Sequence, residues 1–354
     1  MRYDVGSPFS KGRRANQDAV VVAKLRAAGA IVVAMTNVPE QLLWFDSENK
    51  LDGATRNPYD TRRGPGGSSG VLSLDGLLPD VGPMVKYNTA GPMCRYAEDL
   101  ELMFRVMAGQ KAEELRLDSQ VLLRNLKVFY MEDEGSFLLS RVKGECRKAV
   151  REVVDFIRND HGVEVSRLEV PELRYGIPKW ILAYQESKSR PLYDLFRPGS
   201  KGINHTTEIL RILTGTCPNT AAAILLCWAS TLSCLSSERA LNAFRGTLDH
   251  LRDYLEALLG DDGVFILPGA TAPAAYHHQD LFFPDGFNFT CVFNVLQVPV
   301  SVCPVLRTSD GLPVAVQVVA SRGNDRLCLA VAKEIERKFG GWVEPARAKQ
   351  RLRG

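Results

Sequence analysis

A stretch rich in glycine, proline and serine, from Gly53 to Gly70, constrains the fold more than any other part of the chain. Asn57-Pro58 and Gly64-Pro65 mark two turns, because proline fixes its own φ and disfavours a helix at the residue before it. Gly66-Gly67 then allows positive φ and a close approach of the main chain to a bound group. Ser68-Ser69 follow directly, so their hydroxyls are candidates for a functional site. The same pattern also occurs in ordinary connecting loops, and the surrounding sequence has to distinguish the two.

Upstream of this loop the sequence predicts a helix followed by a strand. Asp18 to Ala28 has apolar residues at helical spacing, and Gly29 is placed to end the helix. Ala30 to Met35 is short, apolar and β-branched, which is typical of a strand covered on both faces. The polar turn 36–40 follows this strand, at the position where open α/β sheets place their sites. Residues 41–45 are expected to begin another helix.

Downstream, amphipathic segments alternate with short apolar runs. We expect helices over 94–107, 141–159, 180–193, 236–259 and 325–338, and a flexible break at 197–202. We expect strands over 126–131, 163–170, 264–268, 298–304 and 312–320. This alternation predicts an α/β fold.

Two apolar features each allow two interpretations. The segment Ala221 to Leu235 is either a buried core helix or a helix that faces lipid or lines a substrate tunnel, and it is too short to span a bilayer. Phe283, Phe287, Phe289 and Phe293 either fill the core or line an apolar acyl pocket.

Composition excludes several classes of function. The 44 basic and 41 acidic residues give a net charge of +3, and this near balance does not indicate binding to nucleic acid. The eight cysteines are dispersed without CxxC pairs, so we expect free thiols in a reducing compartment and no metal site. His277-His278 is not expected to bind a metal, because adjacent side chains on extended backbone point apart. Without a secretory signal or a long apolar run, the chain is expected to be intracellular, either cytoplasmic or peripheral on a membrane.

Several motifs, taken in order, resemble the amidase signature family of serine hydrolases. They lie at 18–31, 36–37, 53–58, 66–70, 91–99 and 311–317. Residues 91–99, 260–265 and 339–343 are most similar to the fatty-acid amide hydrolase branch of this family. The resemblance implies a central mixed β-sheet flanked by helices on both faces. It also implies one incomplete amidase domain over 1–345, followed by a basic tail at 346–354.

The resemblance further implies acyl transfer by a Ser–Ser–Lys arrangement, in which a neutral lysine takes a proton through a bridging serine and a second serine attacks the carbonyl. The bridging serine would be Ser68, with Gly66, Gly67 and Ser69 as binding residues of the same loop. The substrate would be a fatty-acyl amide, split into a fatty acid and an amine without a cofactor. This implies a lipid as partner and no nucleic acid, and it allows peripheral membrane association and a homodimer.

The chain departs from the family pattern at two places. The lysine of the family would precede Met1, and the nucleophile belongs to a second motif, Asp-x-Gly-Gly-Ser-Ile-Arg, that should follow Gly70. Here Val71 to Gly76 follows instead and resembles the region beyond that motif. We therefore expect a chain that lacks an N-terminal and an internal segment and is catalytically inactive. The internal loss should also remove a core strand and expose its neighbours.

Two other functions remain open. The chain could be a non-catalytic lipid-binding or regulatory protein of the same fold. It could also be an amidotransferase subunit that acts on charged transfer RNA within a complex, although its near-neutral charge and apolar segments argue against this.

Overall fold

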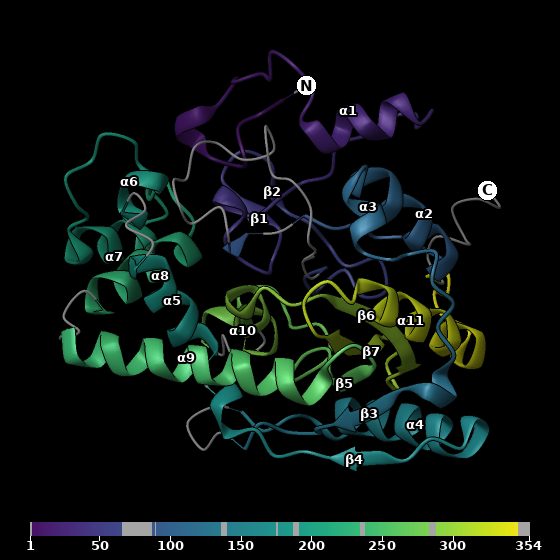
Figure 1. Cartoon of the computed structure of the whole chain (residues 1–354). Helices are drawn as coiled ribbons and strands as arrows, with labels where there is room; N and C mark the ends of the chain where they lie inside the picture. Colours follow the sequence, from purple (N-terminus) through teal and green to yellow (C-terminus); the bar gives the residue numbers. More distant parts are fainter. Residues whose placement is uncertain are drawn as a thin grey trace.

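A mixed five-stranded β-sheet forms the centre of the molecule (Figure 1). The computed structural model describes residues 2–65, 87–88, 90–135, 140–174, 176–186, 191–233, 238–282 and 288–345. The strands are β3 (Lys127–Tyr130), β4 (Val165–Arg167), β5 (Gly263–Pro268), β6 (Val300–Arg307) and β7 (Pro313–Ala320), in the order β4-β3-β5-β7-β6. β3 runs parallel to β4 and β5, whereas β7 is antiparallel to β5 and β6.

The middle of the sheet is the core of the protein. All six residues of β5 are buried, as expected for a strand with neighbours on both edges and helices over it. On β7, residues Val316 to Ala320 are also buried, and Gln317 is the polar exception. Its side-chain amide donates to the carbonyls of Pro268 and Phe289, so this buried polar group is satisfied.

Two long helices, α4 (Gly144–His161) and α11 (Asp325–Phe339), pack on the sheet and against each other. Both are amphipathic, and each ends at a glycine in the left-handed conformation, with φ of 66° at Gly162 and 82° at Gly340. Phe156 of α4 meets Phe339 of α11 edge to face, with ring centroids 5.8 Å apart. α10 (Asn288–Leu296) approaches the sheet through the Gln317–Phe289 contact.

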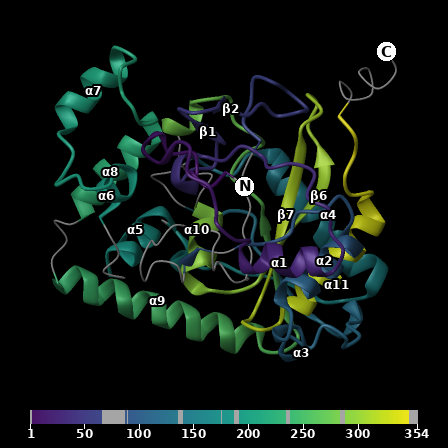
Figure 2. The same ribbon diagram turned by 90° about the horizontal axis from the view of Figure 1, so that it is seen from above.

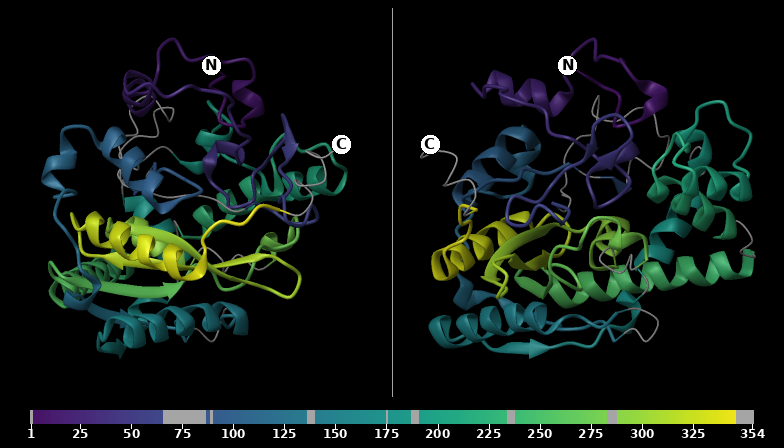
Figure 3. Two further views of the ribbon diagram at one scale, coloured as in Figure 1. Left: turned by 90° about the vertical axis from the view of Figure 1, so that its right-hand side faces the viewer. Right: turned by 180° about the vertical axis from the view of Figure 1, so that it is seen from behind.

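A helical lobe extends to one side of the sheet (Figure 2). It contains α5 (Gly176–Glu186), α6 (Leu192–Phe196), α7 (His205–Leu213) and α8 (Ala221–Ser233). The long helix α9 (Glu238–Leu259) runs from this lobe to β5, as the views in Figure 3 show. The lobe has a small core of its own, centred on Tyr184, Leu192, Phe196 and Cys227.

The N-terminal part of the chain lies across the top of the sheet in Figure 1. It contains α1 (Val20–Ala27), a hairpin of β1 (Glu48–Asn49) and β2 (Gly53–Ala54), and the pair α2 (Ala97–Ala108) and α3 (Lys111–Glu114). Short 3₁₀ turns lie at Pro8–Ser10, Glu40–Leu42, Leu123–Asn125, Pro171–Leu173 and Gln279–Leu281. α1 is joined to α2 by Lys24, whose ammonium donates to the carbonyls of Met107 and Ala108 at 2.9 and 3.1 Å.

The expected sheet strands and long helices are confirmed to within a few residues. The predicted buried strand at 30–35 is wrong. Ile31 and Val33 are 86% and 91% exposed, and no strand of the described residues pairs with this run. An apolar run becomes a buried strand only when neighbouring strands satisfy its main chain, and the described part of the chain supplies none at this place.

Two helix predictions also needed correction. The predicted helix at 41–45 is instead the 3₁₀ turn Glu40–Leu42, with positive φ at Gln41 and Leu42. Over 180–193 the sequence predicts a single helix, but the structure has two helices, α5 and α6. Residues 187–190, between them, lie outside the described part.

Candidate active site

The four residues assigned to the site, Ser68 with Gly66, Gly67 and Ser69, lie outside the described residues. The structure describes the chain up to Pro65 and the elements that hold it. These elements fix the direction in which the chain enters the glycine-serine motif.

The hairpin before this loop is organised by two asparagines. Asn37 donates to the carbonyls of Ser47 and Gly53 and to the hydroxyl of Thr55, at 3.0 to 3.2 Å. Asn49 is 2% exposed and donates to the Asn37 side-chain oxygen at 2.6 Å, while its own oxygen accepts from two amides of the β1–β2 turn. The polar turn expected after residue 35 therefore orders the hairpin through amide groups.

The loop from Asn57 to Gly64 closes on itself. The Asn57 side-chain oxygen accepts from the amide of Tyr59, which is the Asx turn that Asn-Pro favours. Its side-chain nitrogen donates to the carbonyl of Gly64 at 3.0 Å, and its main-chain amide donates to the carbonyl of Arg63 at 2.9 Å. One buried side chain thus fixes both ends of an eight-residue loop.

The segment 274–277 holds this loop from the other side. The Gly64 amide donates to the carbonyl of Ala275, and the His277 amide donates to the carbonyl of Arg62, both at 3.1 Å. The Arg63 guanidinium lies 4.0 Å from the centre of the Tyr276 ring and donates to the carbonyl of Ala274 at 2.6 Å. Two segments about 210 residues apart in the sequence are joined here.

A buried histidine–carboxylate pair lies beside the loop. His277 Nδ1 and Asp46 Oδ2 are 3.0 Å apart, and the side chains are 18% and 5% exposed. Asp46 Oδ1 and His277 Nε2 are both buried, and neither has a hydrogen-bond partner among the residues that the structure describes. The adjacent His278 faces Glu48 at 3.3 Å, and in this second pair the side chains are 59% and 30% exposed.

Glu40 connects the same region to the helical lobe. Its carboxylate is 3% exposed and accepts from the Asn219 side chain at 2.6 Å and from the Thr220 amide at 2.7 Å, at the start of α8. Burial raises the pKa of this carboxyl above its usual value, and the two hydrogen bonds act in the opposite direction. The neighbouring Gln41 donates to the carbonyl of Leu195 at 2.9 Å.

A cavity of about 120 Å³ lies between residues 44–50, the end of α7, the start of α8 and the segment 278–281. Its lining combines charged residues of the hairpin with polar and apolar residues of the lobe, including Trp44, Asp46, Glu48, Lys50, Thr220 and Asp280. A polar cavity of this size accommodates a small group and no long acyl chain.

The apolar helix expected at 221–235 is largely buried where it is described. In α8, Ala223, Leu226 and Cys227 are buried against α5 and α6, whereas Trp228 is 49% exposed. This result favours the core-helix interpretation. Of the phenylalanines, Phe289 and Phe293 are in the central core, and residues 283 and 287 lie outside the described part.

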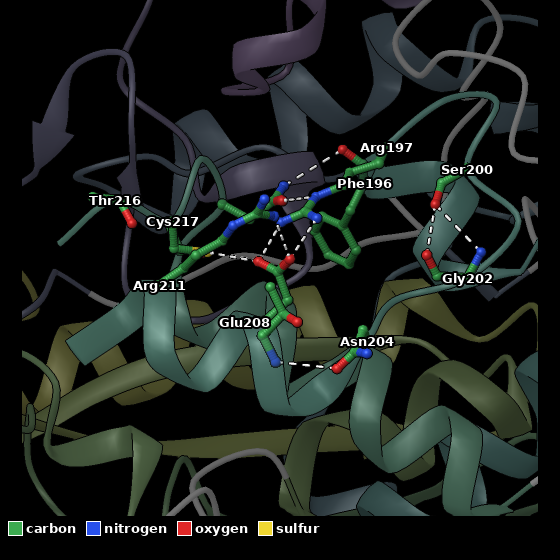
Figure 4. Close-up of polar contacts among 12 residues, drawn as sticks. Phe196, Arg197, Ser200, Gly202, Asn204, Glu208, Arg211, Thr216 and Cys217 are labelled. Carbon is green, nitrogen blue, oxygen red and sulfur yellow. Dashed lines mark hydrogen bonds and ion pairs between the residues drawn. The ribbon is translucent and has the colours of Figure 1, made fainter. Parts of the chain in front are cut away.

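An ion-pair network stabilises the lobe (Figure 4). The Glu208 carboxylate of α7 accepts from both terminal nitrogens of Arg197, at 2.8 and 2.6 Å, and from Arg211 at 2.8 Å. The Cys217 thiol donates to the same carboxylate at 3.4 Å, and Arg197 also donates to Asn219. The hydrogen bonds from Arg197 lower the pKa of Glu208 to about 2. The expected flexible break at 197–202 is thus anchored at its first residue.

Neither a metal site nor a membrane-spanning helix is found in the described part of the chain. No three His, Cys, Asp or Glu side chains converge there as metal ligands, and none of its helices combines the length and apolarity needed to cross a bilayer. The pairing of Asp46 with His277 had no signal in the sequence, because 231 residues separate the two.

Comparison with known proteins assigns the family. The model of the amidase family matches residues 1–71 and 70–329 of the chain. The chain belongs to the amidase family. The expectation of a mixed sheet flanked by helices, as in the amidase-signature enzymes, is confirmed.

Among curated proteins, the chain is 34% identical to human fatty-acid amide hydrolase 2 over 396 aligned positions, which cover 97% of the chain and 74% of the human protein. It is 24% identical to a glutamyl-tRNA(Gln) amidotransferase subunit of Methylacidiphilum infernorum, over 96% of the chain and 79% of that protein. Among solved structures, the corresponding subunit from Thermotoga maritima superposes with a TM-score of 0.74 at 19% identity and covers 98% of the chain and 83% of that structure.

Proposed function

We propose that the chain is a fatty-acid amide hydrolase-like amidase whose family reaction cleaves the C–N bond of long-chain fatty-acid amides to give a fatty acid and an amine. The observation that carries this proposal is the 34% identity with human fatty-acid amide hydrolase 2 over nearly the whole chain. The identity with the amidotransferase subunit is ten percentage points lower over a similar share of the chain.

We further propose that this form of the polypeptide does not catalyse the reaction. The two matches to the family model meet at residues 70–71, where the motif that carries the family's nucleophile is expected. The alignment with the human protein spans 396 positions, more than the 354 residues of the chain, so the human protein has residues without a counterpart here. The exposed apolar run Ala30 to Met35 also fits a strand that has no neighbouring strand among the described residues. Without a nucleophile, the covalent acyl-enzyme route is closed.

The test is hydrolysis of oleamide by the purified chain, together with labelling by a serine-directed fluorophosphonate. Human fatty-acid amide hydrolase 2, assayed in parallel, provides the positive control. We expect neither turnover nor labelling from the chain. Turnover or labelling that Ser68→Ala abolishes would show that the chain is an active hydrolase. Labelling that survives Ser68→Ala would show a reactive serine other than Ser68, which fits Ser68 as the bridging serine but contradicts the proposed inactivity.

A second candidate function is a non-catalytic lipid-binding protein, and the surface of α7 favours it. Ile209, Leu210 and Leu213 are 55%, 59% and 77% exposed on this nine-residue helix. An exposed apolar helix face is suited to the surface of a membrane. Arg211, on the same helix, is paired with Glu208 and adds no free charge to this face.

Liposome flotation tests this function. The chain is expected to float with anionic vesicles, and Leu210→Asp with Leu213→Asp to abolish flotation. A matched control is Leu102→Asp on α2, where the leucine is equally exposed at 62% but far from the lobe. If the control loses binding to the same extent, or if the chain does not float, the lipid-binding function has no support.

The third candidate is an amidotransferase component. The similarity to the amidotransferase proteins is what favours it. Glutaminase activity of the chain in the presence of the other components of such a complex would support it, and its absence beside an active authentic complex would exclude it.

A further inference from the structure

We propose that the groove between α11 and the segment 117–123 binds a small carboxylate with a short apolar chain, and that Arg326 receives the carboxylate group. Every residue that lines this groove belongs to the described part of the chain. The segment 117–123 leads from α3 towards β3 and passes beside α11 (Figure 1). The cavity in the groove has a volume of about 280 Å³, which suits a small ligand. The proposal does not depend on whether the chain hydrolyses an amide.

Apolar side chains from both walls form the floor of the groove. Leu117 and Leu123 of the segment are 7% and 6% exposed, and Leu329 of α11 is 6% exposed. Leu117 and Leu329 belong to one apolar cluster, so the two walls are joined beneath the groove. Val121 and Ala330 are half-buried beside them. A ligand that covers this floor removes apolar surface from water, which favours binding of an apolar chain.

Each of the three acidic side chains that line the groove already has a basic partner. The pairs are Glu101 with Lys333 and Arg105, Asp118 with Arg105 at 2.9 Å, and Glu334 with Arg337. Three carboxylates therefore face three cations. The charges on the rim of the groove are balanced without Arg326.

Arg326 is a cation of the groove without a carboxylate partner in the described part of the chain. Its guanidinium donates to the side-chain oxygen of Asn324, and to the main-chain carbonyl of Asp261 at 3.0 Å. The carboxylate of Asp261 instead accepts from Arg116 at 3.1 Å. A guanidinium has five N–H donors, and these two bonds leave others for a ligand.

The surroundings of Arg326 also favour an added negative charge. Burial and the charge of Arg116 lower the pKa of the Arg326 guanidinium, whereas Asp261 acts in the opposite direction. Arg326 lies in the first turn of α11, where the helix dipole is positive. A carboxylate bound here would offset the repulsion between the two guanidinium groups and accept charge-assisted hydrogen bonds.

The charge and the apolar surface of α11 lie in the order that such a ligand needs. Leu329, Ala330 and Lys333 follow Arg326 by three, four and seven residues, so all four lie on one face of the helix. The helix rises about 10 Å from Arg326 to Lys333, similar to the length of an extended chain of about eight carbon atoms. The far end is closed by Lys333, whose charge is already paired with Glu101. The site therefore fits octanoate, with its carboxylate at Arg326 and its chain along Leu329 and Ala330.

Isothermal titration calorimetry of the full chain with octanoate tests the site. We expect saturable binding of one octanoate per chain. Octanol and octylamine should bind at least about tenfold more weakly, because neither offers a carboxylate to the guanidinium. Equal binding of the three compounds, or no binding of octanoate at millimolar concentration, would contradict the proposal.

Two arginine variants test the role of Arg326. Arg326→Gln should weaken octanoate binding about tenfold and leave octanol binding unchanged, because only the charge is removed. The matched control is Arg322→Gln, which removes the same charge from an exposed residue just before α11 that does not line the groove. Less than about a twofold change is expected from this control. Equal losses from the two variants would mean that long-range attraction alone holds the anion, and would overturn the assignment of Arg326.

A variant that fills the groove tests its location without changing any charge. Ala330→Phe places a large side chain between the two walls and should abolish octanoate binding. Ala243→Phe, at an exposed position of α9, is the control and should bind as the parent chain does. The melting temperature of each variant checks that it is folded. Octanoate binding that survives in folded Ala330→Phe would show that the ligand binds elsewhere on the chain.

Discussion

The Glu208 carboxylate binds the guanidinium of Arg197 through two parallel hydrogen bonds, with both side chains largely buried in the helical lobe. Arg197 precedes α7 and Glu208 lies within it, so the pair ties the loop between α6 and α7 to the helix that follows. The Cys217 thiol and Arg211 complete the hydrogen bonding of the carboxylate. A lobe with a small apolar core depends on such a pair more than the central sheet does.

Replacing Glu208 by alanine should destabilise the lobe by about 3 kcal/mol, because Arg197 is then left buried without a counter-charge. Urea unfolding followed by circular dichroism measures this change. Asp249→Ala, which removes a carboxylate that is 67% exposed and pairs with Arg252 on α9, serves as the control and should have little effect. Equal losses from the two variants would contradict the role of burial.

The Glu208–Arg197 pair also predicts a loss of stability in acid. The folded pKa of Glu208 is about 2, below its ordinary value of 4.5, so the unfolded chain binds the proton more tightly. The stabilisation is complete above pH 4.5 and is lost as the pH falls towards 2. Thermal unfolding of the parent and of Glu208→Gln should therefore converge between pH 4.5 and 2. A constant gap over this range would show that Glu208 carries no shifted pKa.

The buried carboxyl group of Glu134 predicts the opposite dependence of stability on pH. Burial raises its pKa from 4.5 to about 7, while Asn288 donates to Oε1 at 2.9 Å and Oε2 has no partner among the described residues. The folded state binds the proton more tightly, so stability falls as the pH rises from 4.5 to 7.

Glu134→Gln, which removes this titration, should match the parent near pH 4.5. At pH 8 it should be more stable by about 2 kcal/mol, less than the full shift gives because water screens part of the charge. Chemical denaturation at both pH values checks this. Arg174 and Lys179 also surround Glu134, so Glu132→Gln, on a carboxylate paired with Arg151, is the control.

Two helical glycines should respond to alanine in opposite directions. A Cβ at Gly176, in α5, would lie 2.3 Å from the carbonyl oxygen of Asn288 in α10, so Gly176→Ala should cost about 1–3 kcal/mol. Gly246 lies within α9 with open space around it, and Gly246→Ala should stabilise by about 0.5–1 kcal/mol. Melting temperatures of the two variants decide this, and a loss at Gly246 would show that α9 has an unseen neighbour.

Charge on the run 30–35 should leave stability unchanged and improve solubility. Ile31→Lys and Val33→Lys alter side chains that are almost fully exposed, so the free energy of unfolding should change by less than about 0.5 kcal/mol. Light scattering on heating should show less aggregation, because the apolar β-branched run is interrupted. A large destabilisation would mean that this run is buried after all.

Much of the fold could be read from the sequence. The segments that became β5, β7, α4 and α11 have strong periodicity or continuous apolar runs, and these patterns follow directly from burial against one sheet. The order of the motifs also predicted the amidase family, which the comparisons confirm.

The run 30–35 shows where local pattern fails. Its residues have the composition of a buried strand, yet a strand also needs neighbours to satisfy its main chain, and these come from elsewhere in the chain. The helix predicted at 41–45 was wrong for a similar reason. Gln41 and Leu42 have positive φ in a turn that contacts α6 and the start of α8, and these contacts come from distant parts of the chain.

The sequence by itself determined the family, the order of helices and strands and the place of the glycine-serine motif, because all of these depend on residues that are close together in the chain. Only the tertiary structure decided that Asp46 lies against Gly64, that His277 pairs with Asp46, and that Glu40 reaches the start of α8. These contacts join residues up to 231 positions apart, and their partners are fixed by packing of the whole chain. Local sequence patterns do not indicate which distant side chain a residue will contact.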